Sequence, residues 1–287
     1  MNIEIQNQGL TKCEETEVRK LLSKVDNRLT ADLEQMWYLI DLIWDECGCD
    51  NITLDWKKIE TFYSHPVWIL NSLFSEQDKE SIGHREAIIE YILVYNFNEI
   101  IDYGGGPGAI SRLLAKQDEK LKISIFEPYP SEFGINKIKK FKNIKYIDKL
   151  DRGKLYDCLI SIDVLEHVLD PLKDLYKMVD CINFDGFLVI GAPFYPVIKC
   201  HLPKNFHFRY TLRFFAKFMG LKVVGHINNR QHTVYKKTKR VYFSWKTVRF
   251  FEKVSRVLFP ILEAARAMIW NPYKLVKRSF FLRYKSN

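Results

Sequence analysis

The segment "IIDYGGGPGAI", residues 100–110, constrains the fold of this chain more than any other stretch. Four glycines occur within the five positions 104–108, and only Pro107 interrupts them. Glycine loses more backbone freedom on ordering than any other residue, so such a run is poor in a strand and worse in a helix. An apolar run precedes the glycines and a helical pattern follows them. The segment therefore predicts a tight turn between a strand and a helix.

This turn belongs to a region, residues 96–237, in which short apolar runs alternate with helical patterns. Strands are predicted at "NEIIDY", "LKISIF", "NIKYI", "YDCLISI", "GFLVIGA", "LKVVGHI" and "HTVYKK". Strands that alternate with helices indicate βαβ units, which build a mostly parallel sheet. The predicted fold class is α/β, and ligands of such sheets bind beyond the carboxyl ends of the strands.

Two helical regions flank this core. Residues 1–95 show helical periodicity, as in "LTADLEQMWYLIDLIWDE", where the apolar residues fall on one face. Residues 238–287 combine basic residues with many aromatics and read as amphipathic helices. We therefore divide the chain into an N-terminal region on the lid or substrate side (1–95), a core (96–237) and a basic tail (238–287).

The net charge of +9 is unevenly distributed along the chain. Residues 1–196 carry 23 basic and 33 acidic side chains, whereas residues 197–287 carry 21 basic and 2 acidic side chains. An asymmetry of this size indicates an anionic partner for the basic part, without saying which partner it is.

Three features of the sequence favour a cytoplasmic protein. No uninterrupted apolar run reaches the roughly 18 residues that a membrane-spanning helix needs. The N-terminus lacks a basic segment followed by an apolar one, so we expect no secretory signal. The six cysteines are scattered apart from "CGC", and buried free thiols explain them better than a metal site does.

The glycine segment also fits a cofactor-binding fingerprint. Gly104, Gly106 and Ala109 match Gly-x-Gly-x-x-Ala, in which backbone N–H groups approach a ligand at a helix N-terminus. The fingerprint alone does not separate NAD from other adenosine cofactors. Asp102, two residues earlier, suits a cationic group on the ligand better than a pyrophosphate. Glu127 ends the second strand, where an acid can accept hydrogen bonds from both ribose hydroxyls.

The segments "IIDYGGGPG", "FEP", "YDCLISIDVLEHVLDPL" and "GFLVIGAPFY" together resemble class I S-adenosylmethionine-dependent methyltransferases. The resemblance covers residues 95–237 and is silent on substrate. It implies a Rossmann-like sheet of seven strands in the order 3-2-1-4-5-7-6, with the seventh antiparallel, and S-adenosylmethionine as the cofactor.

The same resemblance implies a cofactor site residue by residue. The glycine loop wraps the methionine part, Glu127 holds the ribose, and a residue after strand three meets the adenine amine. Asp148 takes the last place, with Asp151 as the alternative. The predicted cofactor-binding residues are Asp102, Tyr103, Gly104, Gly105, Gly106, Glu127, Pro128, Asp148, Ile162 and Asp163.

A catalytic base is predicted at His167 in "DVLEHV", near the mouth expected for the acceptor. Positioning supplies much of the barrier reduction in methyl transfer, but a hydroxyl acceptor also has to lose its proton. The alternative is a histidine that packs the start of a helix. Asp163, Glu166 and His167 also resemble a pattern of ubiquinone-type O-methyltransferases, some of which bind a divalent ion there. We predict no metal, because many relatives with "LEH" use none.

Acceptor-binding residues are predicted in two segments besides this loop. "KCHLPKNFHFRYTL" follows strand five, where similar enzymes frame their acceptors, and "FYSHPVWIL" could form a lid. The predicted residues are Tyr63, His65, Trp68, Phe194, Tyr195, His201, His207, Arg209 and Tyr210. The alternatives are a polar loop for the first segment and core aromatics for the second.

The predicted function is methyl transfer to a small molecule, with a hydroxyl of a sugar or lipid-linked glycan as the expected acceptor. An NAD-dependent oxidoreductase would share the glycine loop. It would also need a hydride-site acid or a Tyr-x-x-x-Lys pair, and neither stands in the right place in this sequence. An RNA methyltransferase would use the basic region. Methylation of a base amino group is disfavoured, because strand four runs into "IDVLEHV" and not into an Asn-Pro-Pro-Tyr type motif. A non-catalytic scaffold is the third class, which the intact loop and Glu127 oppose.

The tail is predicted to lie on an anionic membrane surface. Its apolar residues Trp245, Val248, Phe251, Val254 and Leu258 recur at helical steps, beside the basic residues Lys246, Arg249, Lys253 and Arg256. Pro260 is expected to end this helix, and "ILEAARAMIW" to start another. The alternative is that these helices pack on the acidic core.

Overall fold

A seven-stranded sheet forms the centre of the computed structural model, which describes residues 1, 3–6, 8–151, 153–239 and 243–284, and the backbone alone for residues 269–284. The strand order is β3-β2-β1-β4-β5-β7-β6, with β7 antiparallel to both β5 and β6. This confirms the predicted fold class and strand order. The strands are β1 (Glu99–Tyr103), β2 (Lys122–Phe126), β3 (Ile144–Ile147), β4 (Tyr156–Ile162), β5 (Ile182–Gly191), β6 (Leu221–Ile227) and β7 (His232–Lys237).

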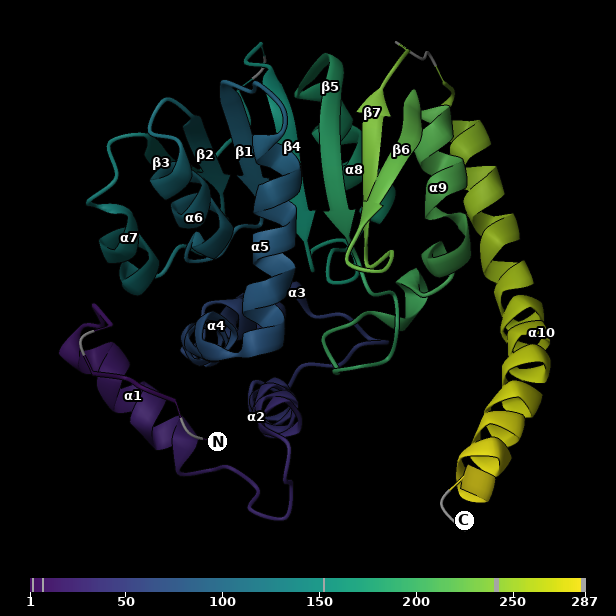
Figure 1. Cartoon of the computed structure of the whole chain (residues 1–287), viewed down its shortest axis with the longest axis horizontal. Helices are drawn as coiled ribbons and strands as arrows, with labels where there is room; N and C mark the ends of the chain where they lie inside the picture. The colour runs from purple at the N-terminus through teal and green to yellow at the C-terminus, as the bar shows by residue number, and fades with distance from the viewer. Residues whose placement is uncertain (2, 7, 152, 240–242, 285–287) are drawn as a thin grey trace.

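The central strands are apolar on both sides because helices cover both faces of the sheet (Figure 1). On one face, α8 (Pro171–Asp180) and α9 (Phe208–Phe218) share a core with Leu159 and Leu188. On the other face, α5 (Lys79–Leu93) and α6 (Ala109–Gln117) pack against Ile100 and Ile123. The carboxyl ends of β1, β2 and β4 therefore open onto one edge of the sheet, where the predicted site residues follow.

The first four helices build a core of their own, separate from the sheet. They are α1 (Lys12–Leu22), α2 (Asp32–Glu46), α3 (Trp56–Tyr63) and α4 (Val67–Gln77). Their core includes Trp44, Phe62 and Leu70, and it is joined by Phe133 from α7 (Glu132–Ile138) and by Leu202 after β5. In Figure 1 these helices lie beyond the carboxyl ends of the strands, so they border the site edge.

The tail forms one helix, α10 (Trp245–Tyr284), and the predicted break at Pro260 is wrong. A proline removes one helical hydrogen bond and bends a helix, but the helix can continue beyond it. In Figure 1, α10 runs along α9 and extends past the edge of the sheet domain.

The predicted membrane-facing stripe of α10 is also wrong in its first half. Val248 is buried, and the Phe251 ring packs at 5.5 Å from Phe214 on α9. Arg249 of the predicted basic stripe pairs with Asp170, and Arg256 pairs with Glu252 at 2.6 Å. This face therefore packs on the sheet domain, as the alternative had it. Among the described residues, no helix is both long and apolar enough to cross a bilayer.

Candidate functional site

The glycine loop after β1 presents bare backbone to open space. Gly104 has a φ of +72° and an added Cβ would lie 2.5 Å from the Val164 side chain. Gly106 has a φ of +50°, but its added Cβ would meet nothing within 4 Å. Gly104 is therefore required by packing as well as by conformation, whereas Gly106 faces a space that a ligand can fill.

Asp102 lies under this loop and supports it. Its carboxylate accepts a hydrogen bond from Ser111 Oγ at 2.7 Å, and an added Cβ at Gly105 would lie 2.5 Å from its carboxyl carbon. Burial raises the pKa of Asp102 to about 6. The predicted role of Asp102, facing a cationic group of the ligand, stays a prediction.

Glu127 joins the loops that follow β1 and β2. Its Oε2 accepts a hydrogen bond from the Gly106 N–H at 3.0 Å, and its Oε1 accepts one from the Tyr129 N–H at 3.0 Å. Burial raises the pKa of Glu127, although both backbone bonds favour the charged form. Each oxygen keeps a second lone pair, so the carboxylate can still accept from two ribose hydroxyls. Pro128, the next residue, is exposed.

Tyr146 on β3 is a loop partner that the sequence analysis missed. Its hydroxyl donates to the Gly106 carbonyl at 2.8 Å, and so it fixes the other side of the same glycine. Asp148 follows β3 at the same edge and is exposed. These positions agree with a cofactor that lies across the ends of β1, β2 and β3.

Tyr103 is placed differently from the other predicted cofactor residues. Its side chain is buried, packs at 4.8 Å from the Phe126 ring, and donates a hydrogen bond to Asp174 at 3.0 Å. The side chain is thus part of the hydrophobic core, and only the Tyr103 backbone lies at the edge where the cofactor site is predicted.

Asp163 follows Ile162, the last residue of β4, in a left-handed conformation with a φ of +55°. Its N–H donates to the Gly191 carbonyl at 2.8 Å, which ties the ends of β4 and β5 together. The carboxylate reaches solvent from a cavity on one side, while surrounding protein raises its pKa to about 6. Positive φ is uncommon outside glycine and is found at functional sites, which agrees with the predicted role of this residue.

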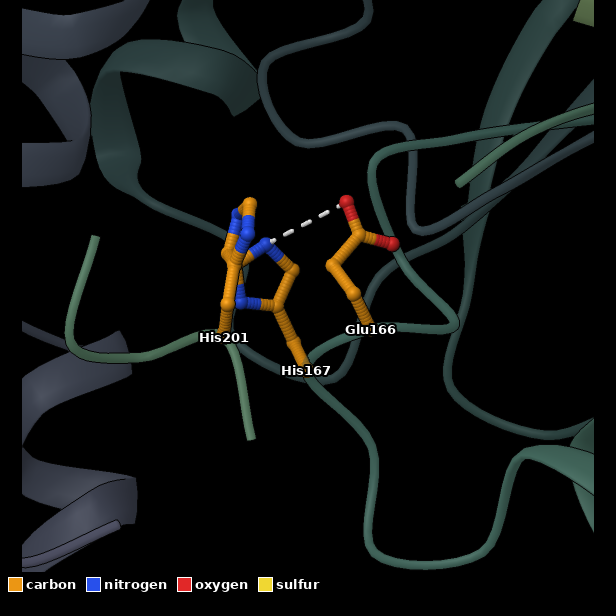
Figure 2. A group of neighbouring side chains, drawn as sticks. All are labelled: Glu166, His167 and His201. Carbon is orange, nitrogen blue, oxygen red and sulfur yellow. Dashed lines mark ion pairs between the residues drawn. The ribbon is translucent and has the colours of Figure 1, made fainter. Parts of the chain in front are cut away.

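His167 and His201 come together although they are far apart in sequence. Leu202 donates its N–H to the Glu166 carbonyl at 3.1 Å, which holds the segment after β5 against the segment after β4. The His167 and His201 rings lie 4.7 Å apart, nearly perpendicular (Figure 2). The sequence analysis named both residues but not their contact.

Both of these histidines are neutral with the same ring nitrogen protonated. His167 Nδ1 lies 3.2 Å from the Cys200 carbonyl, and His201 Nδ1 lies 2.7 Å from the Tyr195 carbonyl. A carbonyl only accepts, so Nδ1 carries the proton and each Nε2 keeps a free lone pair. Burial lowers the pKa of His201 and lowers that of His167 to about 3.

Glu166 is a fully buried acid beside this pair. No hydrogen bond reaches either carboxyl oxygen from the described residues, and His167 Nε2 is 3.8 Å away (Figure 2). That distance is too long for a hydrogen bond. Burial, with Asp163 nearby, raises the pKa of Glu166 well above its usual value, which favours the protonated form.

Glu166, His167 and His201 each place a lone-pair atom within 4.8 Å of the others. Each imidazole donates a hydrogen bond from Nδ1–H to a carbonyl and keeps Nε2 free as a ligand atom. Two such imidazoles and a carboxylate can together hold a divalent cation. The set differs from the one considered in the sequence, because His201 takes the place of Asp163.

Two of the predicted lid residues lie at His167 and the third does not. Tyr63 stacks on Trp68 at 5.5 Å, and both rings stand nearly perpendicular to the His167 ring, at 6.2 and 6.3 Å. His65 instead accepts the Val67 N–H at 3.1 Å, at the start of α4. Tyr129, next to Glu127, stacks on Tyr63 at 6.2 Å and connects this wall to the cofactor side.

A cavity of about 760 Å³ opens beside Asp163, between the end of β5, α9 and the β6–β7 turn. The lining includes the rings of Phe194, Tyr195 and Tyr210, and the guanidinium of Arg209. The Tyr195 carbonyl holds His201, so the cavity and the histidine pair are adjacent. Arg213 and Arg230, which the sequence analysis did not name, also line this cavity.

Three predicted acceptor residues use polar atoms of their side chains in contacts with α10. His207 Nδ1 lies 2.7 Å from Ser255 Oγ, and Arg209 pairs with Glu263 at 2.6 Å. The Tyr210 hydroxyl donates to the same carboxylate. His207 is buried in this contact, whereas Arg209 and Tyr210 also line the cavity.

His232, at the start of β7, is a cavity residue that the sequence analysis missed. It is buried, its ring nitrogens lack hydrogen-bond partners among the described residues, and burial lowers its pKa to about 4. An added Cβ at Gly191 would strike its ring, so glycine makes room for it. Its sequence context, a strand start in "HTVYKK", offered no signal of this.

The fold and site define a class. A sheet of this order, a glycine loop with open backbone after β1 and an acid at the end of β2 are the parts of a class I S-adenosylmethionine-dependent methyltransferase. The residues present fit that cofactor, because Gly106 leaves room and Glu127 has accepting lone pairs to spare.

Comparison with known proteins agrees with this class. Residues 70–227 match the family described as "Methyltransferase domain". The chain belongs to this family, and the site described above fits S-adenosylmethionine as its cofactor.

Similar proteins include two that are named ubiquinone biosynthesis O-methyltransferase. The one from Rickettsia prowazekii is 30% identical over 150 residues, which are 47% of this chain and 58% of that protein. The one from Rickettsia felis is 28% identical over 154 residues, which are 49% of this chain and 62% of that protein. The similarity thus spans about three fifths of the relatives' length. An O-methyltransferase family structure from Burkholderia thailandensis aligns with a TM-score of 0.49 at 14% identity, over 64% of this chain and 63% of that one.

Proposed function

We propose that this protein transfers a methyl group to a hydroxyl oxygen of a small molecule, with a sugar or lipid-linked glycan as the acceptor. The observation that carries this proposal is the cavity beside Asp163, which combines aromatic rings with arginines. Aromatic rings stack on the apolar faces of sugars, and guanidinium groups bind phosphate, which links many sugars to their carriers. The names of the Rickettsia relatives support oxygen as the accepting atom.

S-adenosylmethionine supplies an electrophilic methyl group on a sulfonium that loses its charge during transfer. The chain supplies position: the glycine loop, Glu127 and Asp163 hold the cofactor side, and the cavity holds the acceptor. Alignment of the two reactants accounts for most of the acceleration in such a reaction.

We assign the proton of the acceptor hydroxyl to His167. Its Nδ1 is held by the Cys200 carbonyl, which leaves Nε2 as the accepting atom. A pKa near 3 makes His167 a weak base on its own, so it orients the hydroxyl and takes the proton only as the new C–O bond forms. Tyr63 and Trp68 shield it from solvent on the N-terminal side.

We propose that the reaction needs no metal. The raised pKa of Glu166 favours its neutral form, and a neutral carboxyl lacks the negative charge that usually attracts a divalent ion. The same three side chains would become ligands if Glu166 lost its proton on binding a cation. Removal of divalent ions therefore tests this part of the proposal.

We also propose that the protein works in the cytoplasm. Cys158, Cys181 and Cys200 are buried as free thiols, which suits a reducing compartment. The NAD-dependent oxidoreductase is not supported, since the chain belongs to a methyltransferase family.

The experiment is transfer of radioactive methyl groups from S-adenosylmethionine to a cell extract, followed by separation into lipid, nucleic-acid, protein and water-soluble fractions. We expect label in the lipid-linked or water-soluble glycans, as a methyl ether that survives mild base. Label in RNA would favour the RNA methyltransferase. Label in a methyl ester or amine would overturn the assignment of a hydroxyl.

A further inference from the structure

The outer face of α10 carries an apolar stripe that no part of the protein covers within the described residues. Phe250 is 62% exposed, Val257 72%, Ile261 63% and Met268 75%. With Val254 between them, these residues recur at steps of four and three, apart from the last step of seven. At 100° per residue they share one side of the helix.

This stripe lies opposite the side that packs on the sheet domain. The inward contacts of α10 come from Ser255, Phe259 and Glu263, which reach His207, Tyr210 and Arg209 in turn. Helical geometry puts Ile261 about 120–160° from these positions. The exposed residues therefore do not belong to the contact with α9, and they differ from most of the stripe predicted in the sequence.

The charges around the stripe are positive. Lys246 and Lys253 are exposed beside it, and no acid lies within ion-pair distance of either one in the described part of the chain. The two acids of α10, Glu252 and Glu263, are held inward by Arg249, Arg256, Arg209 and Arg266. In sequence, residues 269–287 add five basic residues and no acid.

We propose that the outer face of α10 docks on an anionic lipid bilayer, with the apolar stripe at the boundary of headgroups and acyl chains. A helix with an apolar face and basic borders lies in the plane of such a surface. A second copy of the chain fits worse, because pairing two such faces would bring lysines together with no acids to match them. Charge complementarity thus selects the lipid.

The docked position also suits the acceptor. Glu263 holds Arg209 of the cavity wall, and the Arg266 guanidinium lies 5.3 Å from the Tyr195 ring. The middle of α10 therefore runs past the cavity, and docking brings the cavity close to the bilayer. This last point rests on the lipid-linked acceptor proposed above, whereas docking itself does not.

The test is flotation of the full-length protein with vesicles of phosphatidylcholine and phosphatidylglycerol at 3:1, compared with pure phosphatidylcholine, at low salt. We expect the protein to float with the anionic vesicles only. Val257→Asp and Ile261→Asp should each lower the bound fraction roughly tenfold or more, because a charge replaces an apolar side chain that the bilayer would bury. Ile52→Asp, at a position 83% exposed before α3, is the matched control and should float as the wild type does.

A second pair of variants tests the charges. Lys246→Gln with Lys253→Gln should weaken flotation with anionic vesicles, and Lys142→Gln with Lys145→Gln, exposed near β3, should not. No flotation of the wild type, or flotation of Ile261→Asp equal to wild type, would overturn the proposal. A dimer in sedimentation that Ile261→Asp abolishes, without vesicle binding, would assign the face to a second copy. Binding of S-adenosylhomocysteine without vesicles shows separately whether the methyltransferase site is intact.

Discussion

The N–H of Gly106 donates a hydrogen bond to Glu127 Oε2 at 3.0 Å, while the carbonyl of Gly106 accepts one from Tyr146 at 2.8 Å. One glycine is thus held on both sides of its backbone, by the residue that follows β2 and by one from β3. The loop has its shape before any cofactor binds, so binding costs little ordering of the chain.

Adjacent glycines of this loop should respond differently to alanine. Gly106→Ala adds a methyl group to open space, at a strain cost of about 1–2 kcal/mol for its positive φ. We expect it to fold but to bind S-adenosylhomocysteine at least tenfold more weakly. Gly105→Ala pushes on Asp102 and should lower the free energy of unfolding by about 1–3 kcal/mol. Denaturant unfolding and calorimetry separate the two effects, and full affinity in Gly106→Ala would show that the ligand lies elsewhere.

Glu166 should make stability depend on pH. The pKa of Glu166 in the folded protein is raised above the usual 4.5. At a pH above 4.5 but below this raised pKa, the native state therefore holds a proton that the unfolded chain releases. Stability is then lost as pH rises, by up to about 1.4 kcal/mol per pH unit from this group. Glu166→Gln removes the term, so the variant should gain on the wild type from pH 5 to pH 7 in denaturant unfolding. Glu90→Gln, an exposed acid on α5, should follow the wild-type curve. Parallel curves for Glu166→Gln and the wild type would mean that Glu166 ionises normally.

Methyl transfer should survive removal of divalent ions. We expect activity after dialysis against EDTA to stay within about twofold of the untreated protein, because burial favours a neutral Glu166 that attracts no cation. A loss of activity that Mg²⁺ or Mn²⁺ restores would make Glu166, His167 and His201 a metal site.

His167 should act in catalysis and not in cofactor binding. His167→Gln is expected to lower kcat about 10²–10⁴-fold, the usual range for a base, with unchanged affinity for S-adenosylhomocysteine. His226→Gln, exposed on β6, serves as the control. If His232→Gln lowers kcat by such a factor and His167→Gln does not, the base is the unpartnered histidine in the cavity.

The sequence predicted the sheet well because its central strands are apolar runs that stand between clear helical patterns. Both β1 and β4 are buried on two sides, and the residue that ends each strand could be read directly. Glu127 was predictable for the same reason, since its place follows from the end of β2.

The side-chain clusters could not be predicted, because they depend on contacts between distant segments. His201 meets His167 only since the segment after β5 hydrogen-bonds to Glu166, and no pattern within either segment shows this. The helix α10 has two apolar stripes, and either could have packed on the sheet domain. The stripe that contains Phe251 does so, because Phe251 packs on the Phe214 and Phe218 rings of α9. Periodicity shows that a face exists but does not say what covers it.

Binding of S-adenosylmethionine should depend on Glu127 and the glycine loop. Calorimetric titration with S-adenosylhomocysteine tests this directly in the wild type, in Glu127→Ala, and in Glu90→Ala as a matched control. Loss of two charge-assisted hydrogen bonds costs about 2–4 kcal/mol, so affinity in Glu127→Ala should fall about a hundredfold while Glu90→Ala binds normally. Wild-type affinity in a folded Glu127→Ala would contradict the account.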